Sequence, residues 1–184
     1  MKEFIQKLRD IYAVEVLRNR ILITILFLAV YRLGSFVILP GISTSGLEAA
    51  LGDSNAGLLG LLNTFTGGAF FSAAIFALGI MPYISASIIV QLLGFTIPFF
   101  QKLQKDGENG QRKINQITRI ITIGITVVQG STYLTFLSSY DGVLLQGMQP
   151  TIFWISNIVI LTSGTMFCMW LGERITDKGV GNGI

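Results

Sequence analysis

Residue types that perform covalent chemistry are scarce in this sequence and do not occur in patterns that would let them act together. Histidine is absent, Asp and Glu fall in segments predicted to be loops or tails, and no serine stands beside a plausible base. Zinc sites of the usual Cys and His kind are therefore excluded. Cys168 is the single cysteine, and its apolar neighbours favour a packing role. We predict that the protein is not an enzyme, and we identify no cofactor motif.

The most informative pattern is physical rather than catalytic, and it lies in the uncharged stretch FALGIMPYISASIIVQLL. Its eighteen residues are long enough to cross most of the hydrocarbon core of a bilayer. Ile80, Ile84 and Ile88 follow one another at helical spacing, and Ser87 and Gln91 form a neighbouring polar pair. Such an apolar stripe is usually a packing surface. The sharper interpretation is a hydrophobic constriction that closes a pore by excluding water.

Pro82 stands in the middle of this stretch, three residues after Gly79. Proline has no amide hydrogen, so in a helix it could not donate to the carbonyl of Leu78. We therefore expect a kink or a local loosening near Gly79–Pro82.

The composition is typical of a protein that is integral to a membrane. Hydrophobic residues make up 51% of the chain, charged residues make up 12%, and the mean hydropathy is +0.65. A typical soluble domain is about 25% charged. The fold class that we predict is an all-α membrane protein.

Four apolar segments are predicted to cross the membrane. They cover about residues 21–39, 73–97, 120–137 and 152–171. Residues 1–20 are predicted to form an amphipathic segment on the membrane surface, with an apolar face made of Phe4, Leu8, Ile11 and Tyr12. Residues 172–184 are predicted to form a polar loop.

Two features of this plan leave alternatives open. The helix-forming part of residues 56–71, Gly57–Phe65, is too short to span, so it is either a re-entrant, plug-like element or a helix lying flat at the interface. Arg32 is the one charge in the first predicted span. Its place near the end of that span favours snorkelling or a local ion pair.

The basic residues predict the orientation. If the N-terminus is cytoplasmic, four spans place twelve of the thirteen Lys and Arg residues on the cytoplasmic side, with Arg32 as the remainder. The outer segments, residues 40–68 and 138–150, have none. This distribution follows the positive-inside rule, and it explains the net charge of +3 without nucleic acid.

Several segments together resemble a known family. The stretch FALGIMPYISASIIVQLL, followed by GENGQRK and MWLGERITDKGVGNGI, closely resembles the SecY-type channel of the general protein-secretion translocase, in its bacterial form. The segments RLGSFVILPGI and LLNTFTGGAF fit the same pattern in the same order, and the resemblance runs from about Arg18 to Ile184.

The resemblance implies a fold and a mechanism. Members of this family have about ten spans in two pseudo-symmetric halves, so the chain would supply about the first half, with four transmembrane helices and a short re-entrant plug helix. Unfolded polypeptides cross through an hourglass pore that is closed by a ring of apolar side chains and a plug. A lateral gate releases apolar segments into lipid.

Four groups of residues take roles by position in this resemblance. The resemblance assigns Ile80 and Ile84 to the pore ring. It assigns to the plug, about residues 58–72, Leu58, Leu59, Leu61, Leu62, Asn63, Phe65, Gly67 and Gly68. It assigns to the lateral gate Ser85, Ile88, Gln91 and Gln129. It assigns to a cytoplasmic loop that binds partners Lys102, Lys105, Arg112 and Lys113.

The resemblance also implies partners and a location. The partners are small membrane subunits of the SecE and SecG type, a translocation ATPase or a ribosome on the cytoplasmic side, signal sequences, unfolded polypeptides and membrane lipids. The location is the bacterial cytoplasmic (inner) membrane, as a multi-pass protein with a cytoplasmic N-terminus.

Two other functions remain alternatives at this point. One is a small-solute transporter with a broken helix, although no acid inside a span is available to couple ions. The other is a membrane assembly factor. We also expect the chain to be part of a longer protein, either as a fragment or as an incompletely described chain rather than as half of a split channel, because spans five to ten of the family would follow Ile184.

Overall fold

The computed structural model describes residues 14–51, 57–145 and 149–183, and within these ranges the chain is helical. The described helices are α2 (Glu15–Gly34), α3 (Thr44–Leu51), α4 (Leu58–Phe65), α5 (Met81–Thr96), α6 (Pro98–Lys105), α7 (Gly107–Ser138) and α8 (Pro150–Lys178). Strand pairing in these ranges is limited to two isolated antiparallel bridges, Ile38 with Ala74 and Ile42 with Leu144. The predicted all-α class is confirmed. The amphipathic face predicted from Phe4 to Tyr12 lies outside the described residues.

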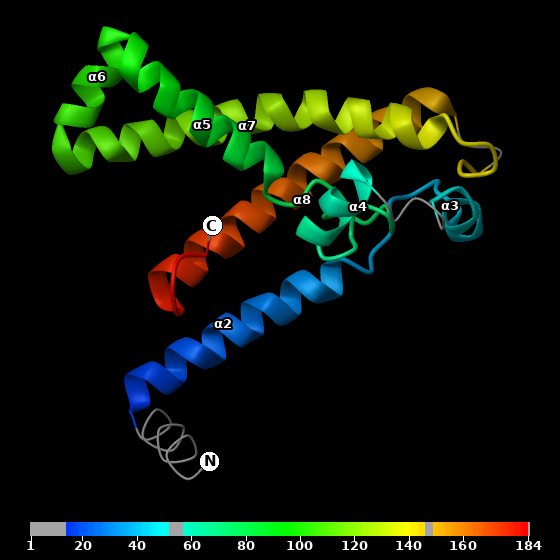
Figure 1. Cartoon of the computed structure of the whole chain (residues 1–184), viewed down its shortest axis with the longest axis horizontal. Coiled ribbons are helices and arrows are strands. Elements are labelled where there is room, and N and C mark those ends of the chain that lie inside the picture. The colour runs from blue at the N-terminus through cyan, green and yellow to red at the C-terminus, as the bar shows by residue number, and fades with distance from the viewer. Residues whose placement is uncertain (1–13, 52–56, 146–148, 184) are drawn as a thin grey trace.

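The long helices share two ends of the molecule (Figure 1). The start of α2, the α5–α6 turn, the start of α7 and the end of α8 lie at one end, on the left of the view. Helix α3 and the connection from α7 to α8 lie at the other end. Helices α5 and α6 pack against α7, α7 packs against α8, and α2 packs along α8. Helix α4 lies between these ends, near the crossing of α7 and α8.

Two of the described helices, α7 and α8, are each long and apolar enough to cross a membrane. Helices α5 and α6 meet this condition only as a pair, and the pair is bent by 99° at the break before Pro98. Helix α2 is 20 residues long but carries Arg18, Arg20 and Arg32, and it is not among these candidates. The described residues therefore hold two or three candidate spans, and the count of four stays a prediction.

The helices and the predicted spans do not share all of their ends. Residues 101–116, which fall between the second and third predicted spans, belong to α6 and α7, which meet at Asp106. Helix α8 continues to Lys178 through part of the predicted polar loop, and α3 lies between the first predicted span and the predicted plug. The first span was predicted to reach Leu39, but α2 ends at Gly34. Lys, Arg, Glu and Gln are good helix formers, so a helix can continue past its apolar segment.

The kink or local loosening predicted near Gly79–Pro82 is not a kink within a helix, because the residues before Met81 form turns. Helix α5 begins at Met81, so Pro82 occupies its first turn and not its middle. The amides of a first helical turn have no partner within the helix, so a proline there removes no bond. The predicted second span, residues 73–97, is therefore helical only from Met81.

Residues 66–80, called the turn segment below, form a non-helical core element. Ala69, Ala73 and Ala77 in it are fully buried. Its backbone pairs with the chain after α2, because the amide of Leu39 donates to Ala73 at 2.9 Å and the amide of Ile75 donates to Val37 at 2.9 Å. Non-helical backbone at membrane depth must be enclosed by protein and have its polar groups satisfied. These small side chains let the surrounding helices come close enough to enclose it.

Candidate functional site

The two residues predicted for the pore ring stand one helical turn apart at the start of α5. The backbone of Ile80 precedes the helix, and the amide of Ile84 donates to its carbonyl at 3.0 Å. Ile80 packs partly against the buried cluster around Phe76 and Cys168. Ile84 is 37% exposed and Ile88 is 51% exposed, so this apolar stripe is not covered by the described residues. An uncovered stripe of branched side chains can contact another apolar surface or close a narrow passage to water.

The predicted plug residues divide between a helix and a turn. Helix α4 holds the positions from Leu58 to Phe65, and the side chain of Leu58 lies outside the described part. Gly67 and Gly68 follow with φ angles of 61° and 93°, a conformation that glycine adopts without strain. The side chain of Asn63 accepts a hydrogen bond from the amide of Phe71 at 3.0 Å. The segment is therefore a short helix followed by a turn at two glycines.

An apolar cavity of about 390 Å³ lies beside this helix. Leu59 and Leu62 line it from α4, and Met81 lines it from α5. The remaining lining residues come from the turn segment and α7, and they are Thr66, Phe70, Ala77, Leu78, Gln129, Thr132, Tyr133 and Phe136. The structure thus places Gln129, predicted for the lateral gate, in the cavity beside α4.

The other residues predicted for the lateral gate lie on α5. The side chain of Gln91 donates to Ser87 at 3.3 Å. Both residues line a second, polar pocket of about 560 Å³, in which Gln129 has no part. Ser85 is half-buried on the same helix, and Ile88 is exposed.

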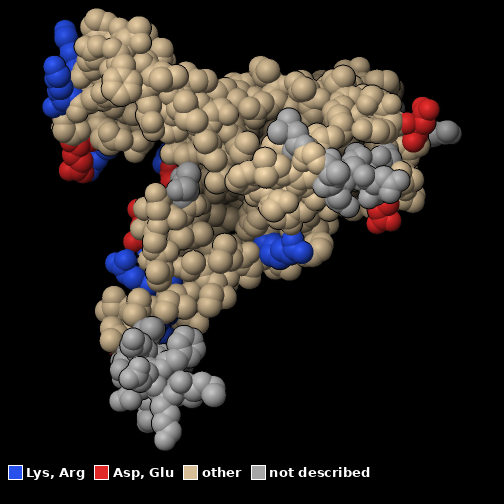
Figure 2. All heavy atoms as spheres, in the orientation of Figure 1, with Lys and Arg blue, Asp and Glu red and all other residues tan. Residues whose placement is uncertain are grey.

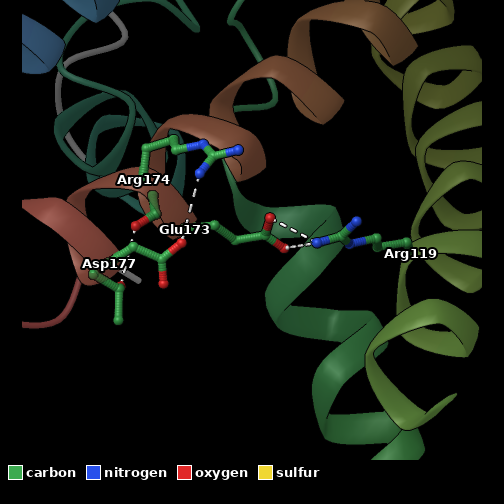
Figure 3. Close-up of polar contacts among 6 residues, drawn as sticks. Arg119, Glu173, Arg174 and Asp177 are labelled. Carbon is green, nitrogen blue, oxygen red and sulfur yellow. Dashed lines mark hydrogen bonds and ion pairs between the residues drawn. The ribbon is translucent and has the colours of Figure 1, made fainter. Parts of the chain in front are cut away.

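The polar pocket is closed on one side by an ion pair that the sequence analysis did not single out. Nη2 of Arg119 on α7 donates to both carboxylate oxygens of Glu173 on α8, at 2.8 Å and 2.7 Å. Figure 3 shows the two side chains pointing toward each other from their helices, with Arg174 and Asp177 beside them on α8. The pocket is also lined by Tyr83, Asn115, Thr176, Asp177 and Asn182. A signal was present, because opposite charges stand at the same predicted end of two successive spans.

The residues predicted for the cytoplasmic partner loop share one exposed end of the molecule. Lys102 and Lys105 lie in the last turn of α6, and Arg112 and Lys113 lie near the start of α7. Figure 2 shows Lys and Arg side chains gathered there, over the end formed by α6 and α7. Arg112 pairs with Glu108 at 2.6 Å, and both side chains are mostly exposed. The arrangement offers a positive surface to an acidic partner.

Comparisons with known proteins agree on one family. The family profile described as SecY matches residues 74–184, which is more than half of the chain. The chain is 45% identical over 169 residues to the protein translocase subunit SecY of Buchnera aphidicola, covering 91% of this chain and 38% of that protein. It is 44% identical to the SecY subunit of Escherichia coli, with coverage of 91% and 38%, and 45% identical to that of Thermus thermophilus, with coverage of 91% and 39%.

These matches also show what share of a relative's length this chain covers. The chain spans roughly two fifths of the length of the relatives named here, and the similarity to each covers nearly all of the chain. The residues that match the family profile include the start of α5, the polar pocket and the basic end of α6 and α7. The chain belongs to the SecY family.

Proposed function

We propose that this chain is the N-terminal part of a pore-forming translocase subunit. The complete subunit would pass unfolded polypeptides across the membrane and release apolar segments sideways into lipid. The observation that carries this proposal is the uncovered apolar stripe at the start of α5, where Ile84 is 37% exposed, three residues after Met81, which lines the cavity beside α4. Flexible aliphatic side chains can seal around varied chains without specific bonds, and when the pore is idle they resist the entry of water and ions.

The plug, the ring and the gate fit this proposal as three parts of one path. Ile80 and Ile84 would supply this half of the constriction. Helix α4 would close the outer side of the path, with Gly67 and Gly68 as its hinge. Ser85, Ile88 and Gln91 would form one lip of the lateral gate. Gln129 stands apart from this lip in the present arrangement, and we propose that it contacts the plug side of the path.

The location and partners are proposed on the pattern of charge. The basic end made by α6 and the start of α7 would face the cytoplasm, in a bacterial inner membrane, with the N-terminus on the same side. A translocation ATPase or a ribosome would bind there through acidic groups. Small subunits of the SecE and SecG type would contact membrane-facing helices, and signal sequences would enter by the gate. The membrane region would cover about residues 21–171, between cytoplasmic segments.

An ion-conductance measurement tests the proposal in the full-length protein that contains this segment. We expect Ile84→Asn to raise the ion conductance of the idle channel in planar bilayers, because a polar side chain holds water in the constriction. Ile155→Asn is the matched control, since Ile155 is 61% exposed on α8 and is assigned no place in the path. Unchanged conductance in Ile84→Asn, or an equal rise in both variants, would sink the pore assignment.

A further inference from the structure

Arg32 is a charge that the proposed pore does not use. It lies in the last turn of α2, and within the described residues no carboxylate pairs with it. Its Nη1 donates to the backbone carbonyl of Gly67 at 2.7 Å. Its guanidinium also lies over the ring of Phe36, with 4.8 Å from Cζ to the ring centroid. The side chain is thus held against a backbone acceptor and an aromatic face instead of an acid.

The preceding residue makes the equivalent contact one position earlier. The hydroxyl of Tyr31 donates to the carbonyl of Thr66 at 2.9 Å. The ring of Tyr31 stacks on Phe76, with centroids 5.4 Å apart and an interplanar angle of 6°. Two consecutive residues of α2 therefore donate to two consecutive carbonyls that follow α4.

These carbonyls belong to the hinge of the short helix. Thr66 directly follows α4, and its amide donates back to Leu62 at 3.1 Å. Thr66 is only 4% exposed, so its carbonyl needs a protein donor in place of water. The C-terminal end of a helix carries partial negative charge, which favours a cation beside it. A guanidinium at Gly67 is therefore placed where it stabilises the seated position of α4.

We propose that Tyr31 and Arg32 form a latch that holds the glycine hinge of α4 and so keeps this helix seated beside the apolar cavity. Both are positioning residues, since they act through the hinge and not on a translocating chain. The role of α4 as a plug rests on the proposed function, whereas the latch itself rests on the contacts of Tyr31 and Arg32. When α4 leaves its seat, both donors lose their acceptors, so the latch sets how often the helix moves.

The position of α4 can be measured directly with a thiol probe. Leu61 is 54% exposed on α4, and Cys168, the single cysteine of this sequence, is buried. Any cysteine outside this sequence would be replaced by serine. In the full-length protein carrying Leu61→Cys, we would compare maleimide labelling rates and idle-channel conductance for Arg32→Gln, Arg32→Lys and Tyr31→Phe. A hydrogen bond to a charged group is worth enough to change the ratio of unseated to seated α4 by roughly tenfold. We expect Arg32→Gln to change the labelling rate severalfold or more and to raise conductance.

The conservative variants separate a latch from a general loss of stability. Lysine keeps a charged donor, so Arg32→Lys should return the labelling rate most of the way to that of the parent. Tyr31→Phe keeps the stacked ring and removes one donor, so its effect should be smaller than that of Arg32→Gln. Arg20→Gln is the matched control, because Arg20 lies on the same helix and donates to Gly179 at 3.4 Å instead of the hinge.

Each outcome decides between the latch and its alternatives. Labelling of Arg32→Gln that equals the parent rate overturns the latch, and so does an equal change in Arg20→Gln. If Arg32→Gln does not fold, Tyr31→Phe decides, and parent-like labelling in that variant overturns the latch. Changed labelling without any change in conductance supports the latch and counts against a sealing role for α4. A leak in Ile84→Asn with parent-like labelling in the Arg32 variants overturns the latch alone.

Discussion

At the scale of single residues, two helices approach the turn segment so closely that a side chain would not fit at the point of contact. A Cβ added at Gly164 on α8 would meet the backbone carbonyl of Ile75 in the turn segment. A Cβ added at Gly34 on α2 would meet the ring of Phe76. Helix packing in membranes relies on such small residues, because they let backbones come close. Two glycines thus help α2 and α8 to enclose a segment that is built of turns and not of a regular helix.

A pair of glycine substitutions tests this point. We expect Gly164→Ala to lower the free energy of unfolding by about 1–3 kcal/mol, because backbone on both sides of the contact must shift. Gly124→Ala is the matched control on α7, where an added Cβ meets open space. It should be neutral or stabilising by up to about 1 kcal/mol, since alanine is the better helix former. Thermal unfolding of the full-length protein in detergent measures both, and equal effects would contradict the packing argument.

At the scale of elements, the sequence predicted the long helices better than the segment between them. The apolar cores of α7 and α8 were found from hydropathy, and only their polar extensions were missed. Residues 73–80 of the turn segment were read as part of a span, because alanines and apolar side chains look the same in a helix and in buried turns. Residues 66–72 were assigned to the plug. The turns of this segment depend on residues distant in sequence, such as Val37, whose carbonyl accepts from Ile75. Hydropathy carries no information about such pairing.

The roles assigned to the site residues stay predictions. The positions of Ile80 and Ile84 came from spacing and from family resemblance, and the structure leaves the α5 stripe uncovered. The separation of Gln129 from Gln91 could not be predicted, because it depends on how α5 crosses α7. The pairing of Arg119 with Glu173 depends on the same packing, and charge position alone offered only a hint.

The ion pair between α7 and α8 gives a prediction at this scale. Arg119 and Glu173 are 47% and 29% exposed, so solvent weakens their attraction, although Nη2 donates to both oxygens. A double-mutant cycle with Arg119→Gln and Glu173→Gln should give a coupling of about 1 kcal/mol in stability. The coupling should fall in high salt. The Arg112–Glu108 pair, at 71% and 81% exposure, is the control and should couple by less than about 0.5 kcal/mol. Equal coupling for the two pairs would contradict this prediction.

At the scale of the whole molecule, charge and exposed apolar surface are distributed for a role within a membrane. Basic side chains gather at the end formed by α6 and the start of α7 (Figure 2). The apolar side of α5 is left uncovered, with Ile88 at 51% and Leu92 at 60% exposure. The relatives are more than twice as long as this chain, so additional surfaces are available in such proteins to cover it. We propose that part of this surface, at Ile80 and Ile84, touches the polypeptide in transit.

Site-specific photocrosslinking tests that claim most directly. A photoreactive residue would replace Ile80, Ile84 or the control Ile155 in the full-length protein, and a secretory polypeptide would be arrested midway across the membrane. The account predicts adducts with the arrested chain at positions 80 and 84 and none at 155. No adduct at 80 and 84, or equal yields at all three positions, would contradict it.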